Sequence, residues 1–468
     1  MKSQTVLPMP QGMSKLFEAI TQFEDSDGTR TDLVLKASLE SGVTKWSTVC
    51  NEILRQSSTI AFDGGNHPSP STEVAFWKAR LKNLEFIYDQ LRDPRVKQMA
   101  KYLEMTKSAY TSTFKKVFKD IVAGVVEARD VCLYLKPLVP HFAAFEDNEL
   151  LENENKIKPL IHCMGLVWAN SKYYCSNEKM VILFREIANM LIDASNRQLD
   201  PESIFQGEPD EMYEKIVKTI DILDFFMESF EFVRDNLATY FRKEDEEMPP
   251  LWTFHKRTVF QRLIDFVNRL KLIKGILATN LGFSKLEKVE FGGIKGRLLS
   301  QKCEQIFDEF GSAYSVFNNI QYDPCDIADD SILRDNDEFF ARCADYDKRL
   351  AAIFSQAFDD CYNLESIFKF LAVIGNLLER PVIRNEITPK YQRIIDIFNE
   401  ELDTVKVIYD EGKKNGVPID KNFPPVAGTL MWLFKLRQRI EKPGEDLKLL
   451  EDDIIKEEEA LHVFDKYD

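Results

Sequence analysis

Apolar residues recur along the chain with the period of an α-helix. Steps of three and four positions alternate at Trp77, Leu81, Leu84, Tyr88 and Leu91, at Ile216, Ile220, Leu223, Met227 and Phe230, and at Tyr391, Ile395, Phe398, Leu402, Val405 and Tyr409. Residues spaced in this way lie on one face of a helix, whereas a half-buried strand alternates at every second residue. The pattern predicts amphipathic helices, and no strong period-two alternation predicts a sheet.

Prolines divide the sequence into long windows that a helix can cross without interruption. The stretches 95–136, 210–248, 251–323 and 325–380 contain no proline, and the chain has 19 Gly and 19 Pro among 468 residues. A β-rich fold of this size needs more Gly for its tight turns. Prolines also break each apolar stripe after a few turns, which favours bundles of antiparallel helices over a long coiled coil. We therefore predict an all-α protein, an elongated series of helical bundles with short, proline-marked connections.

The same patterns predict how the chain is organised. The predicted parts are a weakly patterned, partly helical leader at 1–70, a helical region at 71–442 and an acidic C-terminal helix or frayed tail at 443–468. Bundles of the helical region are expected to break near the proline clusters at 137–159, 249–250 and 381–389. Ser71-Thr72-Glu73 predicts a helix start, with a capping residue and an acid in the first turn.

A double proline predicts the start of the last long helix. Pro424 and Pro425 fix two successive φ angles, and a first helical turn tolerates them because its amide donors are unpaired. The helix is expected to end near Ile440, where Pro443-Gly444 closes it. Gly428 lowers helix propensity by about 1 kcal/mol relative to Ala. A neighbouring helix or partner chain that passes too close for a side chain would explain it, and a slack first turn is the alternative.

Charge and apolar content narrow the classes of partner. The formal net charge is −16, which opposes binding to the phosphates of nucleic acid and to an anionic membrane surface. Partners with basic surfaces are compatible with it, although such a charge also simply keeps a protein soluble. No stretch reaches the roughly 18 uninterrupted apolar residues of a membrane span, and residues 1–12 lack the apolar core of a secretory signal. We predict binding to neither nucleic acid nor membrane.

Cysteine usage indicates a reducing compartment. The Cys residues lie at 50, 132, 163, 175, 303, 325, 343 and 361, and no two form the C-x-x-C pair of zinc and redox sites. We expect buried free thiols and a cytosolic protein.

Candidate chemistry is sparse. The glycine cluster at 291–296 has neither spacing of a phosphate-binding loop and follows no predicted strand, so it predicts a turn between helices. The His residues at 67, 141, 162, 255 and 462 are isolated, and a G-x-S-x-G nucleophile motif is absent. The sequence therefore predicts no catalytic, cofactor-binding or metal-ligating residues.

One group of carboxylates leaves an alternative open. Asp345, Asp347, Asp359 and Asp360 are of the type that hard metal ions and acid–base catalysis use. Lys348 and Arg349 lie beside them, which favours capping and ion pairing instead. A metal-dependent enzyme built on these four residues remains the alternative.

Several segments together resemble the first tail region of dynein heavy chains, most closely of the axonemal branch. They lie in the family's order across about 71–442, at 76–84, 133–138, 285–293, 345–351, 357–361, 377–381 and 424–428. Their signature residues are Trp77, Leu81, Lys136, Pro137, Leu286, Glu287, Gly292, Gly293, Asp347, Arg349, Leu350, Phe358, Asp359, Asp360, Cys361, Glu379, Arg380, Pro381, Pro424, Pro425 and Gly428. Phe423 stands where the family usually has Met, a change between apolar side chains of similar size.

The resemblance implies a non-catalytic tail, or stem, of helical bundles in series. In that family the tail associates heavy chains, carries intermediate and light chains and attaches the motor complex in microtubule-based ciliary movement. The implied partners are other dynein heavy chains, intermediate and light chains and, indirectly, microtubules. The implied location is the cytoplasm, the cytoskeleton and the axoneme of the cilium.

The resemblance also sets expectations about what this sequence lacks. The AAA+ modules of the family do not follow Asp468, so we expect neither binding nor hydrolysis of ATP. The chain is expected to be a tail fragment, a truncated gene product or a motor-less relative. A stand-alone helical scaffold derived from the tail, without a motor, is the second alternative.

Overall fold

The computed structural model describes residues 9–10, 12–25, 32–56, 69–201, 203–241, 251–291, 293–418, 424–449, 462–463 and 466–467. Within these ranges every regular element is an α-helix or a 3₁₀-helix, which confirms the all-α prediction. None of the helices in this part of the chain is both long and apolar enough to cross a membrane. The chain folds into two compact units, one of residues 1–204, 214–271 and 325–327 and the other of 205–213, 272–324 and 328–468.

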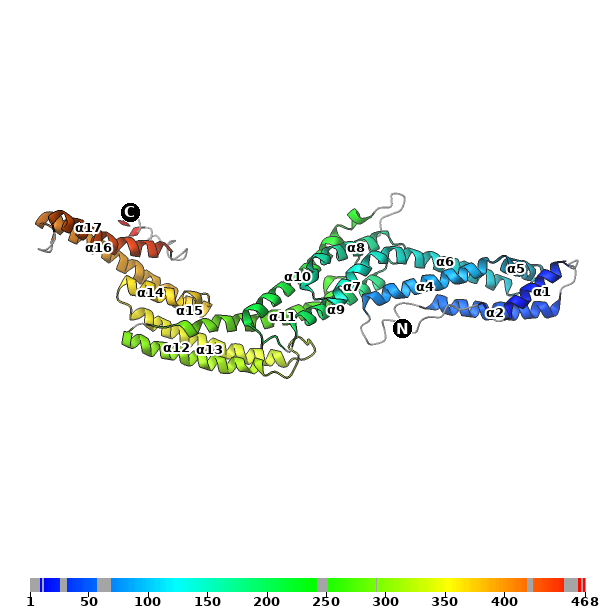
Figure 1. Ribbon diagram of the computed structural model, residues 1–468, viewed down its shortest axis with the longest axis horizontal. Coiled ribbons are helices and arrows are strands. Elements are labelled where there is room, and N and C mark those ends of the chain that lie inside the picture. Colours follow the sequence, from blue (N-terminus) through cyan, green and yellow to red (C-terminus); the bar gives the residue numbers. More distant parts are fainter. Residues whose placement is uncertain are drawn as a thin grey trace. The chain divides into compact units, whose positions relative to one another are not determined.

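Unit 1 consists of antiparallel helices joined by short connections (Figure 1). Its helices are α1 (Met13–Asp25), α2 (Leu33–Arg55), α4 (Pro70–Arg92), α5 (Pro94–Met105), α6 (Thr111–Leu135), α7 (Val139–Asp147), α8 (Ile157–Asn170), α9 (Asn177–Leu199), most of α10 (Pro209–Asp235) and the first part of α11 (Lys256–Ser284). Short 3₁₀ turns are η1 (Lys136–Leu138), η2 (Leu151–Lys156) and η3 (Leu237–Tyr240). α4 packs along α6, and α2 packs against the same helix.

The start of α4 lies slightly earlier than the sequence predicts. Ser69, rather than Ser71, is the N-cap, and its hydroxyl accepts a hydrogen bond from the Ser71 amide at 3.2 Å. Pro70 fills the first helical position, where the lost amide donor has no cost. Glu73 lies in the first turn but is only 2% exposed, so it acts as more than a surface charge at a helix dipole.

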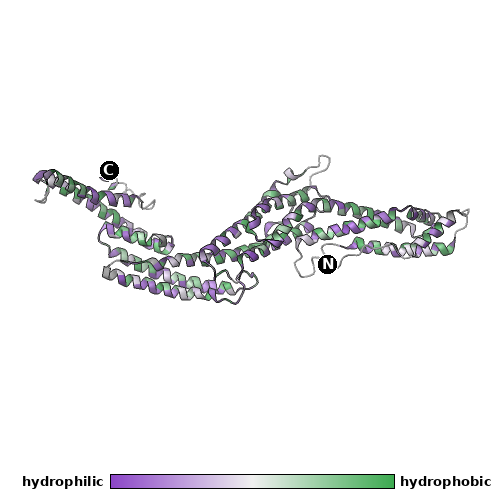
Figure 2. Ribbon diagram, viewed as in Figure 1, coloured by the Kyte–Doolittle hydropathy of each residue, from purple (hydrophilic) through white to green (hydrophobic). Residues whose placement is uncertain are grey.

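Two of the predicted apolar stripes, on α4 and α10, contribute to the core of unit 1. Hydrophobic and hydrophilic residues alternate around each helix, as the helical period predicts (Figure 2). Along α10, the stripe from Ile216 to Phe230 is buried. Phe230 lies among rings from α9, α11 and the loop before α11, with centroids 5.0 Å from Phe184, 5.1 Å from Trp252 and 5.0 Å from Phe260.

Unit 2 continues the helical plan. Its helices are the remainder of α11, α12 (Gly293–Asn318), α13 (Ser331–Asp359), α14 (Leu364–Ile374), α15 (Pro381–Ile387), α16 (Tyr391–Asn415) and α17 (Pro425–Leu449), with the 3₁₀ turns η4 (Lys285–Lys288), η5 (Gly375–Leu377) and η6 (Thr388–Lys390). α13 packs between α12 and α15, and α16 pairs with α17 (Figure 1).

The last helix corrects one prediction. α17 begins at Pro425, as the double proline predicts, but it does not end at Pro443-Gly444: it continues through Pro443 to Leu449. Proline in a helix interior removes a hydrogen bond and normally ends or kinks it. Packing beyond the proline offsets that cost, because Leu447 is 2% exposed and Lys448 lies 5.1 Å from the centre of the Tyr467 ring.

Some predicted features lie outside the described residues. They are the proline pair 249–250, His67, Gly292 and the whole acidic stretch 450–461. The helices α1 and α2 of the predicted leader pack against α5 and α6. The proposed boundaries at 70 and 442 stay a prediction.

Candidate functional site

A buried carboxylate in unit 1 joins α4 to the loop between α8 and α9. One oxygen of Glu73 accepts hydrogen bonds from the Trp77 indole at 2.8 Å and from the Tyr174 hydroxyl at 3.1 Å. Burial, together with the nearby Glu73, raises the pKa of Tyr174 well above its usual value. The phenol therefore stays protonated at neutral pH and remains a donor. This contact stabilises the packing of the loop on α4.

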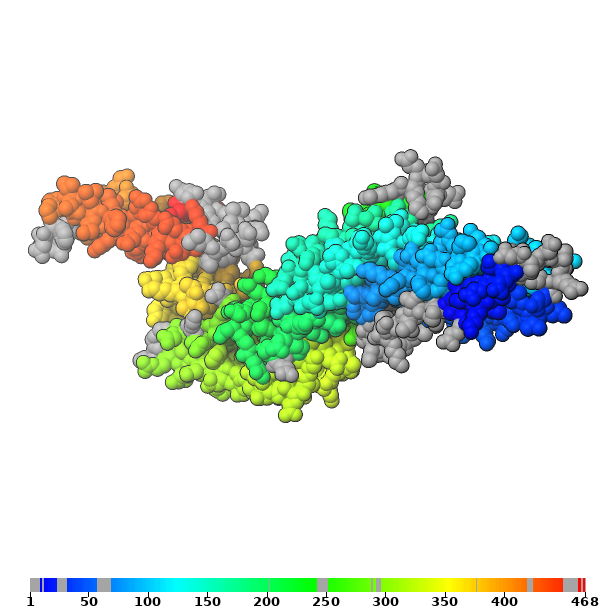
Figure 3. Space-filling view, turned by 45° about the vertical axis from the view of Figure 1, so that its right-hand side comes forward, coloured from blue at the N-terminus to red at the C-terminus, as the bar shows by residue number. Residues whose placement is uncertain are grey.

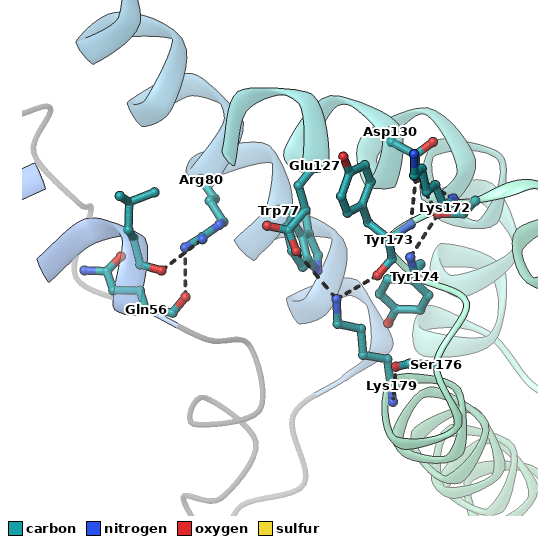
Figure 4. Close-up of polar contacts among 12 residues, drawn as sticks. Gln56, Trp77, Arg80, Glu127, Asp130, Lys172, Tyr173, Tyr174, Ser176 and Lys179 are labelled. Carbon is teal, nitrogen blue, oxygen red and sulfur yellow. Dashed lines mark hydrogen bonds and ion pairs between the residues drawn. The ribbon is translucent and has the colours of Figure 1, made fainter. Parts of the chain in front are cut away.

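Lys179 of α9 also contacts the loop between α8 and α9. The Lys179 ammonium lies 5.2 Å from the centre of the Trp77 ring and donates to the carbonyl oxygen of Tyr173 at 2.9 Å. It also lies 3.8 Å from Glu127 of α6 (Figure 4). A cation over an aromatic face gains about 0.5 to 2 kcal/mol, depending on how far it is desolvated.

Asp130 of α6 organises the backbone of this loop. Its carboxylate accepts from the Ser171 hydroxyl at 2.7 Å and from the amides of Lys172 and Tyr173 at 3.1 and 3.3 Å (Figure 4). The donors come from consecutive residues, so a single carboxylate fixes the turn after α8. Hydrogen bonds to a charged acceptor are roughly twice as strong as neutral ones.

Arg80 completes the network by capping α2. Its guanidinium donates to the carbonyl oxygens of Ile53, Leu54 and Gln56 at 3.1, 3.2 and 2.8 Å. These carbonyls lie at the C-terminal end of α2, where the last backbone acceptors of a helix need partners from outside it, and Ile53 also accepts from the Gln56 amide at 3.2 Å. Burial lowers the pKa of Arg80, and the charge of Glu127 opposes that change. The contacts of this network connect helices to one another, so its role is structural.

Two segments that carry the family resemblance, 345–351 and 377–381, meet at Arg380 in unit 2. Its guanidinium makes two contacts with the Asp347 carboxylate of α13, at 2.5 and 2.9 Å. It also lies 4.0 Å from the centre of the Phe283 ring at the end of α11. Phe283 in turn stacks on Phe310 of α12 with centroids 4.2 Å apart. This arrangement, the Arg380 clamp, ties α11, α13 and the start of α15 together.

A second ion pair joins α12 to α13. Arg349 contacts the Glu309 carboxylate at 2.5 and 3.1 Å and lies 3.8 Å from Asp345. The hydrogen bond from Arg349 lowers the pKa of Glu309. The Tyr346 hydroxyl donates to the Glu309 carbonyl oxygen at 3.3 Å, which adds a neutral contact to the same junction.

The candidate carboxylates do not form one site. Asp345 and Asp359 lie on the same helix, α13, 14 residues apart by their numbers, which is about 21 Å along the axis. Asp359 instead pairs with Lys390 at 2.5 Å and Arg393 at 3.6 Å. In the described ranges no group of three His, Cys, Asp or Glu residues could hold a metal ion. The arrangement therefore favours ion pairing over the metal-dependent enzyme.

The other signature residues are distributed rather than gathered in a single patch. Trp77, Leu286, Leu350 and Phe358 are core residues, whereas Lys136, Pro137, Glu287, Glu379, Pro381, Pro424 and Pro425 are exposed. Leu81, Cys361 and Asp360 are half-buried, and Asp360 caps the C-terminus of α13. Gly293 is described only as the first residue of α12. A shared functional role for the set stays a prediction.

Gly428 and Gly412 differ in what the structure shows of their surroundings. Gly428 is buried although Val426 and Leu430 around it are exposed. A Cβ added to Gly412 of α16 would lie 2.7 Å from the Trp432 ring of α17. The close helix–helix approach in this hairpin is therefore documented at Gly412, a position that the sequence pattern did not single out.

An open groove between α16 and α17 was also missed by the sequence analysis. It has a volume of about 440 Å³ and is lined by apolar residues of both helices, with Lys466 and Tyr467 at its border. The signal that could have revealed it is the run of apolar residues from Val426 to Phe434, which covers more of the helix than one buried face requires. We refer to this feature as the α16–α17 groove.

Comparison with known proteins gives a consistent result across the chain. Residues 36–468 match the family model described as dynein heavy chain, N-terminal region 1. The chain is 38% identical to the ciliary dynein beta chain of Heliocidaris crassispina, 37% to axonemal dynein heavy chain 9 of Homo sapiens and 30% to the flagellar outer-arm dynein beta chain of Chlamydomonas reinhardtii, over 100% of its length in each case. It spans only 10 to 11% of the length of these relatives.

Proposed function

The chain belongs to the dynein heavy chain family, and on that premise we propose that it is a non-catalytic tail segment that holds other subunits of an axonemal motor complex. The observation that supports this proposal is that the buried and half-buried polar side chains described above contact other parts of the fold. Glu73, Asp130, Asp347 and Arg380 all serve to join helices, which leaves interaction surfaces rather than a reactive centre as the means of function.

The proposed partners are other heavy chains and the intermediate and light chains of the complex, with microtubules reached indirectly. Support comes from the relatives, whose names describe ciliary and flagellar dyneins. The proposed location is accordingly the axoneme of a cilium or flagellum. Helical bundles suit such a role, because the packed helices of a bundle hold their surface residues at fixed spacing.

A pull-down tests the proposal directly. The full 468-residue chain, tagged and immobilised, is incubated with ciliary extract, and the bound proteins are identified by mass spectrometry. Dynein heavy, intermediate or light chains should be enriched over an immobilised helical protein of similar acidity. Recovery of none of them would favour a stand-alone helical scaffold instead.

A second measurement addresses the absence of catalysis. Isothermal titration of the purified chain with ATP and Mg²⁺ should give no saturable heat, and phosphate release should equal that of buffer. Saturable binding with hydrolysis would contradict a non-catalytic tail, whatever the pull-down shows.

A further inference from the structure

The α16–α17 groove has the geometry of a binding site for a third helix. Leu402, Val405 and Tyr409 of α16 line one wall, and Leu433, Leu436 and Ile440 of α17 line the other. On each helix these residues step by three and four positions, so each wall is one continuous face. Two antiparallel helices with apolar walls facing a shared groove can accept an amphipathic helix laid between them.

The apolar surface of α17 continues beyond the groove. Val426, Leu430 and Phe434 are 74%, 62% and 61% exposed, and Leu433 is 38% exposed. With the groove wall, they form a stripe from Val426 to Ile440, which is about 21 Å long at 1.5 Å per residue. Single exposed apolar residues are ordinary, but a contiguous stripe marks an interaction site. Figure 3 shows one face of this hairpin in orange.

The charges that line the groove have one sign. Among the described residues that line it, the charged ones are Lys406, Arg437 and Lys466, in a chain whose net charge is −16. Arg437 pairs with Glu441 and Lys466 with Asp403, so their charges are partly compensated. Among the described residues Lys406 forms no ion pair. Electrostatic complementarity therefore selects an occupant with acidic residues beside its apolar face.

We propose that the α16–α17 groove binds an amphipathic helix of about four turns from a partner protein, with Asp or Glu residues flanking its apolar stripe. In the setting of the proposed function, which this inference rests on, that helix belongs to another subunit of the motor complex. Its apolar residues cover Leu430, Leu433 and Phe434, and its acidic flank faces Lys406. The apolar surface of α17 and the Lys406 ammonium of α16 thereby become buried without a buried unpaired charge.

Residues near the C-terminus border the site. Tyr467 packs against Phe398 of α16 with centroids 5.8 Å apart, and its ring lies 2.9 Å from a Cβ built on Gly444. These contacts occupy the end of the groove next to Leu402. The partner helix accordingly begins at Tyr467 and extends toward Tyr409 and Val426.

A peptide selection tests the proposal with the full chain. The probe is a displayed library of 18-residue helical peptides with a fixed Leu stripe and randomised flanking positions. Enriched peptides should carry Asp or Glu at the flanks. A selected peptide, labelled and titrated by fluorescence anisotropy, should bind at least tenfold more weakly to Phe434→Asp and to Lys406→Glu than to the wild type.

Matched variants keep the outcome interpretable. Phe232 of α10 is 64% exposed, close to the value for Phe434, so Phe232→Asp should leave peptide binding unchanged. Lys406→Glu should in turn prefer a version of the peptide with Lys at its flanks. Circular dichroism melting of each variant should match the wild type, which separates lost binding from lost folding.

Other outcomes overturn the proposal. They are basic or random flanks, no enrichment, or binding that Phe434→Asp does not weaken. A wild-type dimer that Phe434→Asp converts to a monomer in light scattering would assign the groove to a second copy of the chain. If the pull-down recovers dynein subunits but no peptide is selected, only the groove assignment fails. Selected peptides without recovered subunits would contradict the proposed function instead.

Discussion

The aromatic core of unit 1 buries its large apolar side chains, whereas the α16–α17 hairpin of unit 2 leaves several of them exposed to solvent. In the core, Phe230 is fully buried and three aromatic rings lie within 5.1 Å of it, centre to centre. In the hairpin, Phe434 is 61% exposed, and among the side chains of α17 that the structure describes only Leu436 and Leu447 belong to the buried apolar set. The apolar surface of the aromatic core is buried when the chain folds, whereas the apolar surface of the hairpin stays available to another molecule.

The largest effect should come from the closed core. Phe230→Ala removes a ring from a fully packed cluster, and such changes cost about 3 to 5 kcal/mol because a cavity remains. Urea unfolding followed by Trp fluorescence measures it, since Trp46, Trp77, Trp168 and Trp252 all belong to unit 1. A loss below about 1 kcal/mol would mean that this region is not closed as described.

The Arg380 clamp should come next. Its charged groups are 17% and 14% exposed at Arg380 and Asp347, so Arg380→Ala leaves a mostly buried carboxylate and also loses the contact with Phe283. We expect a loss of about 2 to 3 kcal/mol, below the value for a fully buried pair because some solvent remains. Hydrogen exchange of α13 and α15 measures it. Asp347→Ala combined with Arg380→Ala should cost less than the sum of the single changes.

The close approach at Gly412 should have a smaller effect. Gly412→Ala places a methyl group 2.7 Å from the Trp432 ring, and overpacking costs typically 1 to 3 kcal/mol. Trp432 is only half-buried and can shift, so we expect about 1 kcal/mol. Gly311→Ala of α12 is the control, because nothing lies within 4 Å of its Cβ and the change should stabilise. Hydrogen exchange of α16 and α12 should therefore move in opposite directions.

Gly428→Leu tests whether a second glycine of this hairpin also has a close neighbour. A close neighbour predicts a loss of about 1 to 3 kcal/mol, in agreement with the burial of Gly428, whereas a slack first turn predicts no loss or a slight gain. Thermal melting followed by circular dichroism distinguishes the two. An unchanged melting temperature with unchanged partner binding would rule out close packing at this position.

Local pattern predicted the all-α class and the stripes of α4, α10 and α16, because a stripe such as Ile216 to Phe230 requires only neighbours along one helix. It could not predict the Arg380 clamp, since Asp347 and Arg380 lie 33 positions apart and meet only through packing. It also failed at Pro443, where contacts of Leu447 and Lys448 outweigh the local preference of proline. The stripe ending at Tyr409 shows a further limit. The pattern predicts an apolar face but not what covers it, and Tyr409 is 45% exposed.

The smallest effect on stability should be the most informative for the comparison. Phe434→Ala makes the same chemical change as Phe230→Ala, but 61% of this ring is already in water, so little transfer free energy is lost. Ala also has a higher helix propensity than Phe, which offsets part of the remainder. We expect a change within about 0.5 kcal/mol, measured by hydrogen exchange of α17, together with a clear loss of affinity for a peptide selected on the groove. A loss of stability comparable to that of Phe230→Ala would show that the ring is covered in the isolated chain. If the hairpin is open, Phe230→Ala lowers the free energy of unfolding, whereas Phe434→Ala lowers only the affinity for the peptide.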